Sequence, residues 1–240
     1  MLRVVIREAA WTAAVQREGT DVPGESIVAR NSSQGGKKYP KPVWFEDHEM
    51  REEARIFLDE FWPEGTTPVD IEQIADVRAS LDIVPMPGIF RAYEIDGFLS
   101  NDMTSIFVDE GIAGGATLHR YRFTLAHELG HWYLHERLYK AARFADVRDF
   151  VRFRDELPPK DRANYEWQAS QFAGLILVPP DVLRETLERA LERARNAGIG
   201  RIDLANYALR DYVAEWIGRR LEVSASVVLR RGADDGLWRR

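Results

Sequence analysis

The sequence contains no cysteine among its 240 residues. This absence excludes disulfide bonds, thiolate metal ligands and cysteine nucleophiles, and it agrees with a reducing compartment. Long hydrophobic runs are also missing: the first stretch, MLRVVIREAAWTAAVQREGT, is interrupted by Arg3, Arg7 and Glu8. A signal-peptide core or a transmembrane span needs a longer apolar run, so we expect a cytoplasmic protein without a membrane segment.

An excess of positive charge is missing as well. The chain has 33 Lys and Arg residues against 39 Asp and Glu residues, which gives a net charge of −6. Nucleic-acid-binding domains usually carry a basic surplus, so direct DNA binding is not expected of this chain. The hydrophobic fraction of 45% and the charged fraction of 30% are those of an ordinary globular protein with a real core.

Three regions are predicted along the chain. Residues 1–47 form an amino-terminal extension and linker, because the stretch NSSQGGKKYPKP has Gly, Ser, Lys and Pro without periodicity. Residues 48–196 form the main domain, and residues 197–240 form a helical carboxy-terminal region with a possible helix-turn-helix, whose second helix Ser224 would cap. The charge balance of that last region is too even to favour DNA binding.

The main domain is predicted to combine several helices with a few short strands. Apolar spacing and Pro or Gly stops indicate helices over 48–62, 117–140, 163–177 and 181–196, and another after Asp70. Strands are expected in LDIVPM, GFLS and TSIFVDEG, whereas residues 143–162 form a loop or a broken helix. The fold class is therefore α+β, with a small sheet of about three strands beside a helical majority.

Three of the five histidines are concentrated in the stretch FTLAHELGHWYLH. His127 and His131 are four residues apart, so they lie on one face of a helix and can bind one metal ion. Glu128 between them can take a proton from a water held by that ion, which makes it the candidate general base. A polar helix that carries histidines by chance is the alternative, but the packing residues around the motif favour the metal site.

A catalytic zinc site needs a third protein ligand and an open position. A histidine in H-x-x-G-x-x-H is disfavoured, because Leu134 stands where glycine would be required, and a cysteine is impossible. A carboxylate from a second helix remains, and NYEWQASQFAGLILVPP offers Glu166 at the start of a helix with apolar spacing. Taken alone, such a glutamate is usually a solvated charge, and Asp161 and Glu156 are the alternatives to test.

The two helices together resemble the ImmA/IrrE family of metallopeptidases. Members of this family pair an H-E-x-x-H helix with a later E-x-x-A-x-x-F-A-x-x-L-L-x-P helix, as RFTLAHELGHWYLH and EWQASQFAGLILVPP do here. The resemblance covers roughly residues 65–180 and implies a zincin-like fold, with His127, His131 and Glu166 as zinc ligands and Glu128 as the general base. Ser170, where the family commonly has Asn, is a departure expected to touch packing and not chemistry.

The resemblance also implies a zinc-dependent endopeptidase, with Mn²⁺ as a possible metal in the cell. Its expected substrate is a helix-turn-helix transcriptional repressor, whose cleavage releases stress-response or mobile-element genes. The alternative is a metal-binding regulatory or toxin–antitoxin-like module with little or no peptidase activity. The intact Glu128 favours the enzyme, because a pure metal sensor needs ligands and no general base. The oligomeric state does not follow from the sequence.

Several further residues are candidates for supporting roles. His135 lies about 12 Å along the helix from His127, too far to share its ion, so a surface or substrate-side position is expected, with support of a ligand or of the oxyanion as the alternative. His119, Tyr133 and Tyr165 could donate a hydrogen bond to an oxyanion. The strand MTSIFVDEG, which directly precedes the motif helix, is expected to offer an exposed sheet edge for an extended substrate.

Overall fold

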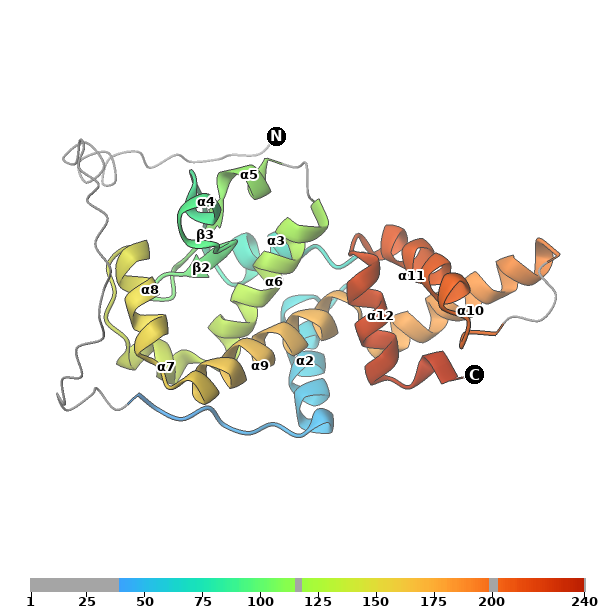
Figure 1. The fold of residues 1–240 in the computed structure, drawn as a ribbon, viewed down its shortest axis with the longest axis horizontal. Coiled ribbons are helices and arrows are strands. Elements are labelled where there is room, and N and C mark those ends of the chain that lie inside the picture. Colours follow the sequence, from blue (N-terminus) through green and yellow to red (C-terminus); the bar gives the residue numbers. More distant parts are fainter. Residues whose placement is uncertain (1–38, 115–117, 199–202, 240) are drawn as a thin grey trace, which may run out of the picture. The chain divides into compact units, whose positions relative to one another are not determined.

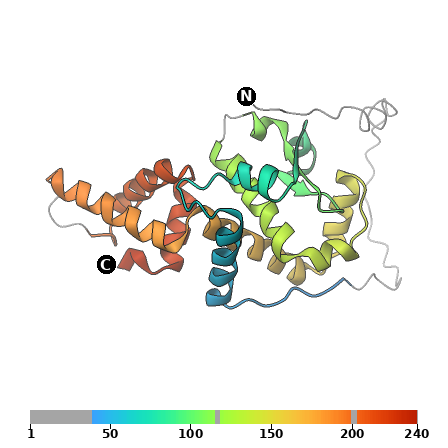
Figure 2. The same ribbon diagram turned by 180° about the vertical axis from the view of Figure 1, so that it is seen from behind.

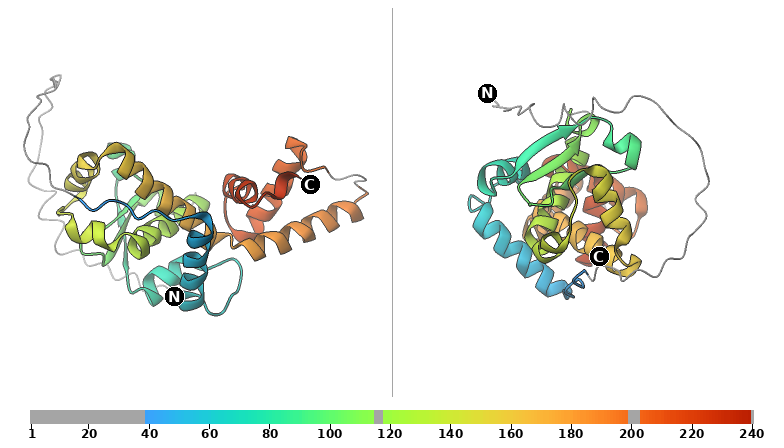
Figure 3. Two further views of the ribbon diagram at one scale, coloured as in Figure 1. Left: turned by 90° about the horizontal axis from the view of Figure 1, so that it is seen from below. Right: turned by 90° about the vertical axis from the view of Figure 1, so that its left-hand side faces the viewer.

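The computed structural model describes residues 39–114, 118–198 and 203–239. Residues 1–37 are separated from residues 38–240 as a different unit of the chain, so the expected amino-terminal extension lies almost wholly outside the described residues. Its described part is Tyr39–Asp47, and Asp47 already begins the first described helix. The segment Tyr39–Glu46, hereafter the strap, runs without regular structure alongside α9 into this helix (Figures 1 and 3). The predicted domain boundaries stay a prediction.

Helices account for most of the described chain, and the α+β class is confirmed (Figure 1). In chain order the helices and strands are α2 (Asp47–Phe61), α3 (Ile71–Gln73), the π-helical turn η1 (Ile74–Arg78), β1 (Asp82–Met86), α4 (Ile89–Tyr93), β2 (Gly97–Leu99), β3 (Ser105–Asp109), α5 (Glu110–Ala113), α6 (Leu118–Leu134), α7 (Glu136–Ala141), α8 (Val147–Glu156), α9 (Pro159–Leu177), α10 (Pro180–Asn196), α11 (Tyr207–Leu221), α12 (Ala225–Asp234) and the 3₁₀ turn η2 (Leu237–Arg239). None of the helices described is long and apolar enough to cross a lipid bilayer.

The three strands form one mixed sheet in the order β1-β3-β2. β1 is parallel to β3, and β2 is antiparallel to it. The prediction that β3 offers an exposed sheet edge is therefore wrong, because β3 is bonded on both sides. β2 is the edge strand that packs against α6, the helix with the histidine motif. Strand order depends on pairings between distant segments, which an argument from neighbours in sequence does not contain.

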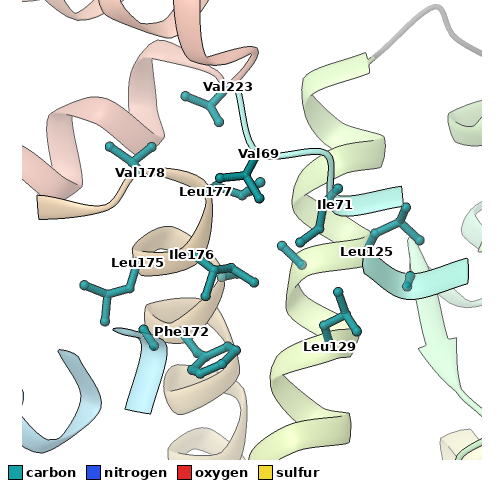
Figure 4. Close-up of a cluster of buried hydrophobic side chains, with 14 of the residues drawn as sticks. Val69, Ile71, Leu125, Leu129, Phe172, Leu175, Ile176, Leu177, Val178 and Val223 are labelled. Carbon is teal, nitrogen blue, oxygen red and sulfur yellow. The ribbon is translucent and has the colours of Figure 1, made fainter. Parts of the chain in front are cut away.

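α6 and α9 pack against each other more extensively than any other pair of described elements, and Figure 2 shows them from behind. Leu125 and Leu129 of α6 face Phe172 and Ile176 of α9, and all four side chains are fully buried (Figure 4). Burying a side chain of this size contributes about 1.5–3 kcal/mol. This apolar contact is therefore what holds the two helices together and sets the distance between residues that they carry.

Gly130 lets the two backbones approach closely. A Cβ atom built at Gly130 would lie 3.1 Å from both the Cα and the main-chain oxygen of Ala169 in α9. A side chain of any size would push the helices apart at this point, because the crowded atoms belong to the backbone. The glycine inside the motif thus allows the polar groups of α6 to reach those of α9.

The motif helix ends earlier than the spacing predicts. α6 stops at Leu134, and His135 has φ −117° and ψ 22° between α6 and α7, so the prediction of one helix to Lys140 is wrong. Residues 143–162 are predicted to be a loop or a broken helix, and the broken helix is confirmed. α8 begins after Asp146, whose side chain accepts a hydrogen bond from the Asp149 main chain. α9 begins at Pro159, four residues before the predicted start.

The carboxy-terminal helices pack against the rest of the unit through buried arginines. Arg231 of α12 is 2% exposed and binds Asp235, which also accepts a hydrogen bond of 2.7 Å from Arg51 of α2. Arg122 of α6 donates to the main-chain oxygen of Glu222. Ser224 occupies the cap position of α12, but its hydroxyl pairs with that of Ser226 and makes no cap hydrogen bond.

Candidate metal centre

Two histidines from α6 and one glutamate from α9 come together at a cleft of the domain. His127, His131 and Glu166 each offer a ligand atom, and these atoms all lie within 4.8 Å of one another. The His127 Nε2 atom is 3.2 Å from the His131 Nε2 atom and 3.2 Å from a Glu166 carboxylate oxygen, and the His131 Nε2 atom is 3.8 Å from the other oxygen. Donors around a tetrahedral zinc ion lie about 3.3 Å apart, so the three groups fit this ion.

The electrostatics of this cluster favour a bound cation. Burial alone would raise the pKa of Glu166, but hydrogen bonds from His127 and His131 and their charges lower it far below its usual value. Burial alone would lower the pKa of His127. The hydrogen bond to Glu166 and the charge of Glu128 outweigh burial, so the pKa of His127 is raised above its usual value. The carboxylate thus stabilises a positive charge among the three groups, and a proton and a metal ion compete for the same place.

Glu128 lies at the same cleft but is not one of the three donors. It is 5% exposed, and burial raises its pKa above the usual value, although the charges of His127 and His131 oppose this. The main chain of Leu99 in β2 gives its carboxylate a hydrogen bond. A buried carboxylate with a raised pKa is suited to accept and return a proton near neutral pH.

The four residues border one cleft of about 290 Å³. Its walls are formed by residues 94–96, which precede β2, by β2 itself, and by α6, α7, α8 and α9. Asp96, Phe123 and Ser170 also border a larger hollow of about 790 Å³ between α6, α9 and α12, so the cleft continues along the molecule. An extended chain could therefore pass the three donors without being enclosed.

Ser170 and Tyr139 were not expected to border the site. The Ser170 hydroxyl is 3.3 Å from the Nδ1 atom of His127, so this departure from the family pattern does touch a candidate ligand and the expectation of packing alone is wrong. Tyr139 of α7 borders the cleft, with its ring centroid 6.0 Å from that of His131. Ser170 could have been found from its spacing of four residues after Glu166. Tyr139 could not, because the helix break before it hides the direction of its side chain.

His135 is buried and contacts a candidate ligand, so its expected surface position is wrong. It is 3% exposed, and its Nδ1 atom is 3.0 Å from the Nδ1 atom of His131. Its Nε2 atom is 3.0 Å from the side-chain oxygen of Gln168 in α9. Burial and the nearby charge of His131 lower its pKa to about 3, so the ring is neutral at pH 7.

The other candidates lie away from the three donors. The Tyr165 hydroxyl donates to the main-chain oxygen of Pro40 in the strap, and the Tyr133 ring packs against Phe172. His119 borders the larger hollow. Of the alternative third ligands, Glu156 accepts a hydrogen bond from Tyr39, and the group of three donors does not include Asp161.

The fold and the donors define a class: an α+β domain in which an H-E-x-x-H helix packs against a helix that contributes an acid, as in zinc metallopeptidases. The family model described as the IrrE N-terminal-like domain, peptidase family M78, matches residues 111–231, and the chain belongs to this family. This confirms the resemblance drawn from the two motifs. The roles of His127, Glu128, His131 and Glu166 stay predictions.

Among curated proteins no match was found. Among solved structures, a Mycobacterium tuberculosis transcriptional regulator is similar, with 14% identity and a TM-score of 0.43. The similarity covers 77% of this chain and 46% of the regulator, so the chain spans less than half of that protein's length.

Proposed function

We propose that the protein is a zinc-dependent endopeptidase that hydrolyses a peptide bond in a protein substrate. The observation that carries the proposal is the meeting of three side chains that could bind a metal ion and one buried carboxylate, Glu128, in a single cleft. As in the resemblance to the ImmA/IrrE family, we propose a helix-turn-helix transcriptional repressor as the substrate, so that cleavage would release stress-response or mobile-element genes. Mn²⁺ could replace zinc at the same ligands.

His127, His131 and Glu166 would hold the ion, which supplies Lewis-acid polarisation of the carbonyl and a more acidic water at neutral pH. Glu128 takes a proton from the attacking water and returns it to the nitrogen of the departing peptide. Burial raises its pKa above the usual value, which favours its holding the proton between the two transfers. Ser170, through the Nδ1 atom of His127, holds the orientation of this ring.

Tyr139 is the proposed donor to the oxyanion that forms on the carbonyl oxygen. Burial raises the pKa of Tyr139 well above 10, so the phenol keeps its proton and can donate it as a hydrogen bond. Its place on α7 puts it beside His131 at the cleft. A donor that is held in position before the reaction stabilises the developing charge without reorganisation, and such a donor contributes on the order of 10²–10³ in rate.

β2 is the proposed docking edge for the substrate backbone. The main-chain oxygen of Asp96 accepts from Asp109, and the Ser100 N–H donates to Ser105, so these two residues face β3. Because hydrogen-bonding direction alternates along an antiparallel pair, the main-chain groups of Gly97 and Leu99 point away from β3, and that of Leu99 already donates to Glu128. An extended substrate could therefore add at Gly97, which borders the cleft beside the three donors.

The test compares the wild type with Glu128→Gln, and Glu136→Gln, an exposed acid on α7, serves as the matched control. Each purified protein is analysed for zinc by mass spectrometry and is then incubated with a repressor encoded beside its gene. We expect about one zinc per chain in all three, and new amino termini with the wild type and the control. Glu128→Gln should keep the metal and lose cleavage. Equal cleavage by Glu128→Gln would refute its role as the base.

The same experiment separates the enzyme from a regulatory metal module. A module would bind zinc and leave the repressor intact, whether or not Glu128 is replaced. A wild-type protein that takes up no zinc would refute the metal site itself, and with it both functions.

A further inference from the structure

A chain of hydrogen bonds connects the candidate ligand His131 to the strap beside α9. The Nδ1 atom of His131 is 3.0 Å from the Nδ1 atom of His135, and the Nε2 atom of His135 is 3.0 Å from the side-chain oxygen of Gln168. The Gln168 amide nitrogen donates a 2.6 Å hydrogen bond to the main-chain oxygen of Val43. His135 and Gln168 are 3% and 1% exposed, so water does not compete for these contacts.

The direction of every hydrogen bond in this chain follows from its last member. A main-chain carbonyl oxygen only accepts, so the NH₂ group of Gln168 must face Val43 and its oxygen must face His135. That oxygen also only accepts, so the Nε2 atom of His135 must carry a proton. The ring is buried and its two nitrogen atoms contact His131 and Gln168, neither of which is a carboxylate, so this is its single proton. The Nδ1 atom of His135 is then a bare acceptor, and the Nδ1 atom of His131 must carry the proton that it receives.

We propose that Gln168 and His135 are positioning residues that transmit the polarity of the Val43 carbonyl to His131. They select the tautomer in which the His131 Nε2 atom has a free electron pair, and this is the atom that lies 3.2 Å from the His127 Nε2 atom. The inference rests on the proposed function only in taking His131 as a metal ligand. Without the chain of contacts, both neutral tautomers of His131 would be populated, and one of them places a proton where the ion must bind.

The surroundings hold the two positioning residues in place. The Tyr165 ring packs edge-on against His135 at 4.8 Å between centroids, and its hydroxyl donates to Pro40 of the strap at 2.8 Å. The ring of Trp44 in the strap stacks on that of Trp167. The strap therefore contacts α9 on both sides of Val43. The position of the Val43 carbonyl oxygen does not depend on the Gln168 hydrogen bond alone.

The first experiment needs no substitution and no metal. Long-range ¹⁵N–¹H NMR spectra of the metal-free wild type report which ring nitrogen of each histidine carries the proton. We expect His131 protonated on Nδ1 and His135 on Nε2. The opposite tautomer of either ring in the wild type would overturn the proposal.

The second experiment measures zinc dissociation constants by competition with a chromophoric chelator. His135→Asn places an amide oxygen near the lost Nδ1 atom and can still accept from His131, whereas His135→Gln reaches only toward Gln168, and His135→Leu makes neither contact. We expect affinity close to the wild type for His135→Asn and a loss of about 10- to 100-fold for the other two, the usual effect of removing a hydrogen-bond partner of a ligand.

Gln168→Met and Tyr165→Phe form a matched pair, because each removes a hydrogen bond to a strap carbonyl. Gln168→Met should populate both tautomers of His131 in the metal-free spectrum and weaken zinc binding, whereas Tyr165→Phe should change neither. Thermal unfolding of each metal-free variant identifies any that fail to fold. Equal zinc affinity of the wild type, His135→Leu and Gln168→Met would overturn the proposal.

These outcomes are distinct from failure of the proposed function. A wild type that binds zinc but cuts no protein leaves the tautomer and affinity measurements intact. If the wild type binds no zinc, the metal assignment fails, and the NMR measurement still decides whether the hydrogen-bond chain sets the His131 tautomer.

Discussion

Replacing Gly130 by alanine should loosen the metal site even though alanine is the better helix former. In a helix interior this change gains about 0.8–1.0 kcal/mol of helix propensity. Against that gain, the new Cβ atom would lie 3.1 Å from the Cα and oxygen atoms of Ala169, so the helices must separate by a few tenths of an ångström. Crowding of this kind in a packed core costs about 1–3 kcal/mol. The free energy of unfolding should therefore fall by about 0–2 kcal/mol.

Zinc affinity should respond more clearly than stability. Gly130 lies one residue before His131, and the atoms that it would push belong to α9, which carries Glu166. The His131 Nε2 and Glu166 oxygen atoms are already 3.8 Å apart, so a further separation strains a shared ion. If about 1.4 kcal/mol of this strain falls on the bound state, the zinc dissociation constant rises about tenfold.

The assay pairs thermal unfolding of the metal-free protein with chelator competition for zinc. Gly174→Ala is the matched control, because its Cβ atom would also meet an atom at 3.1 Å, but this atom belongs to the Arg231 side chain in α12. Its zinc affinity should equal that of the wild type, whatever its stability. If Gly130→Ala is more stable than the wild type and binds zinc equally well, the close approach of the two helices does not set the donor distances.

Two further predictions concern single side chains at the cleft. Removing the hydrogen-bond partner of a ligand weakens metal binding roughly 10- to 100-fold, and Glu166→Ala should weaken zinc binding by more, because it removes a ligand itself. Chelator competition measures the zinc affinity, with Asp161→Asn as the control. Unchanged binding in Glu166→Ala would point to another third ligand. Tyr139→Phe should keep zinc and lower kcat by a factor of about 10²–10³, with little change in KM. Steady-state cleavage of the repressor measures both constants. An unchanged kcat would show that Tyr139 does not stabilise the oxyanion.

The part of the site that could be predicted from the sequence is the part that a single helix determines. The spacing of His127 and His131 sets their relative position within α6 whatever the rest of the chain does. Glu166 required the second helix motif, because no spacing rule connects residues 39 positions apart. The structure brings it to the two histidines through the contact of α6 with α9, which depends on the whole core.

Two features of the structure differ from those predicted, and each difference has a physical cause. His135 is predicted at the surface because it lies about 12 Å from His127 along a helix that Leu134, in place of glycine, should continue. The helix ends there nonetheless, and the buried hydrogen bonds of the His135 ring to His131 and Gln168 are consistent with a tertiary cause. β3 was expected at a sheet edge because it directly precedes α6, whereas the pairing of β1 with β3 places it in the centre. Both results depend on contacts between segments far apart in the chain.

Two separate features of the fold determine how far apart the donor groups of the candidate metal centre lie and which donor atom is free to bind an ion. The close approach at Gly130 sets how near the Glu166 carboxylate comes to α6, whereas the contacts of His135 set which nitrogen of His131 is free. Neither residue would touch the ion, yet loss of either should weaken its binding. An ion shared by α6 and α9 would in turn stabilise their packing, because a ligand that binds only the folded state adds about 2.7 kcal/mol of stability at a hundred times its dissociation constant. Binding of an ion by these donors and the packing of the two helices would therefore be one coupled property of the domain.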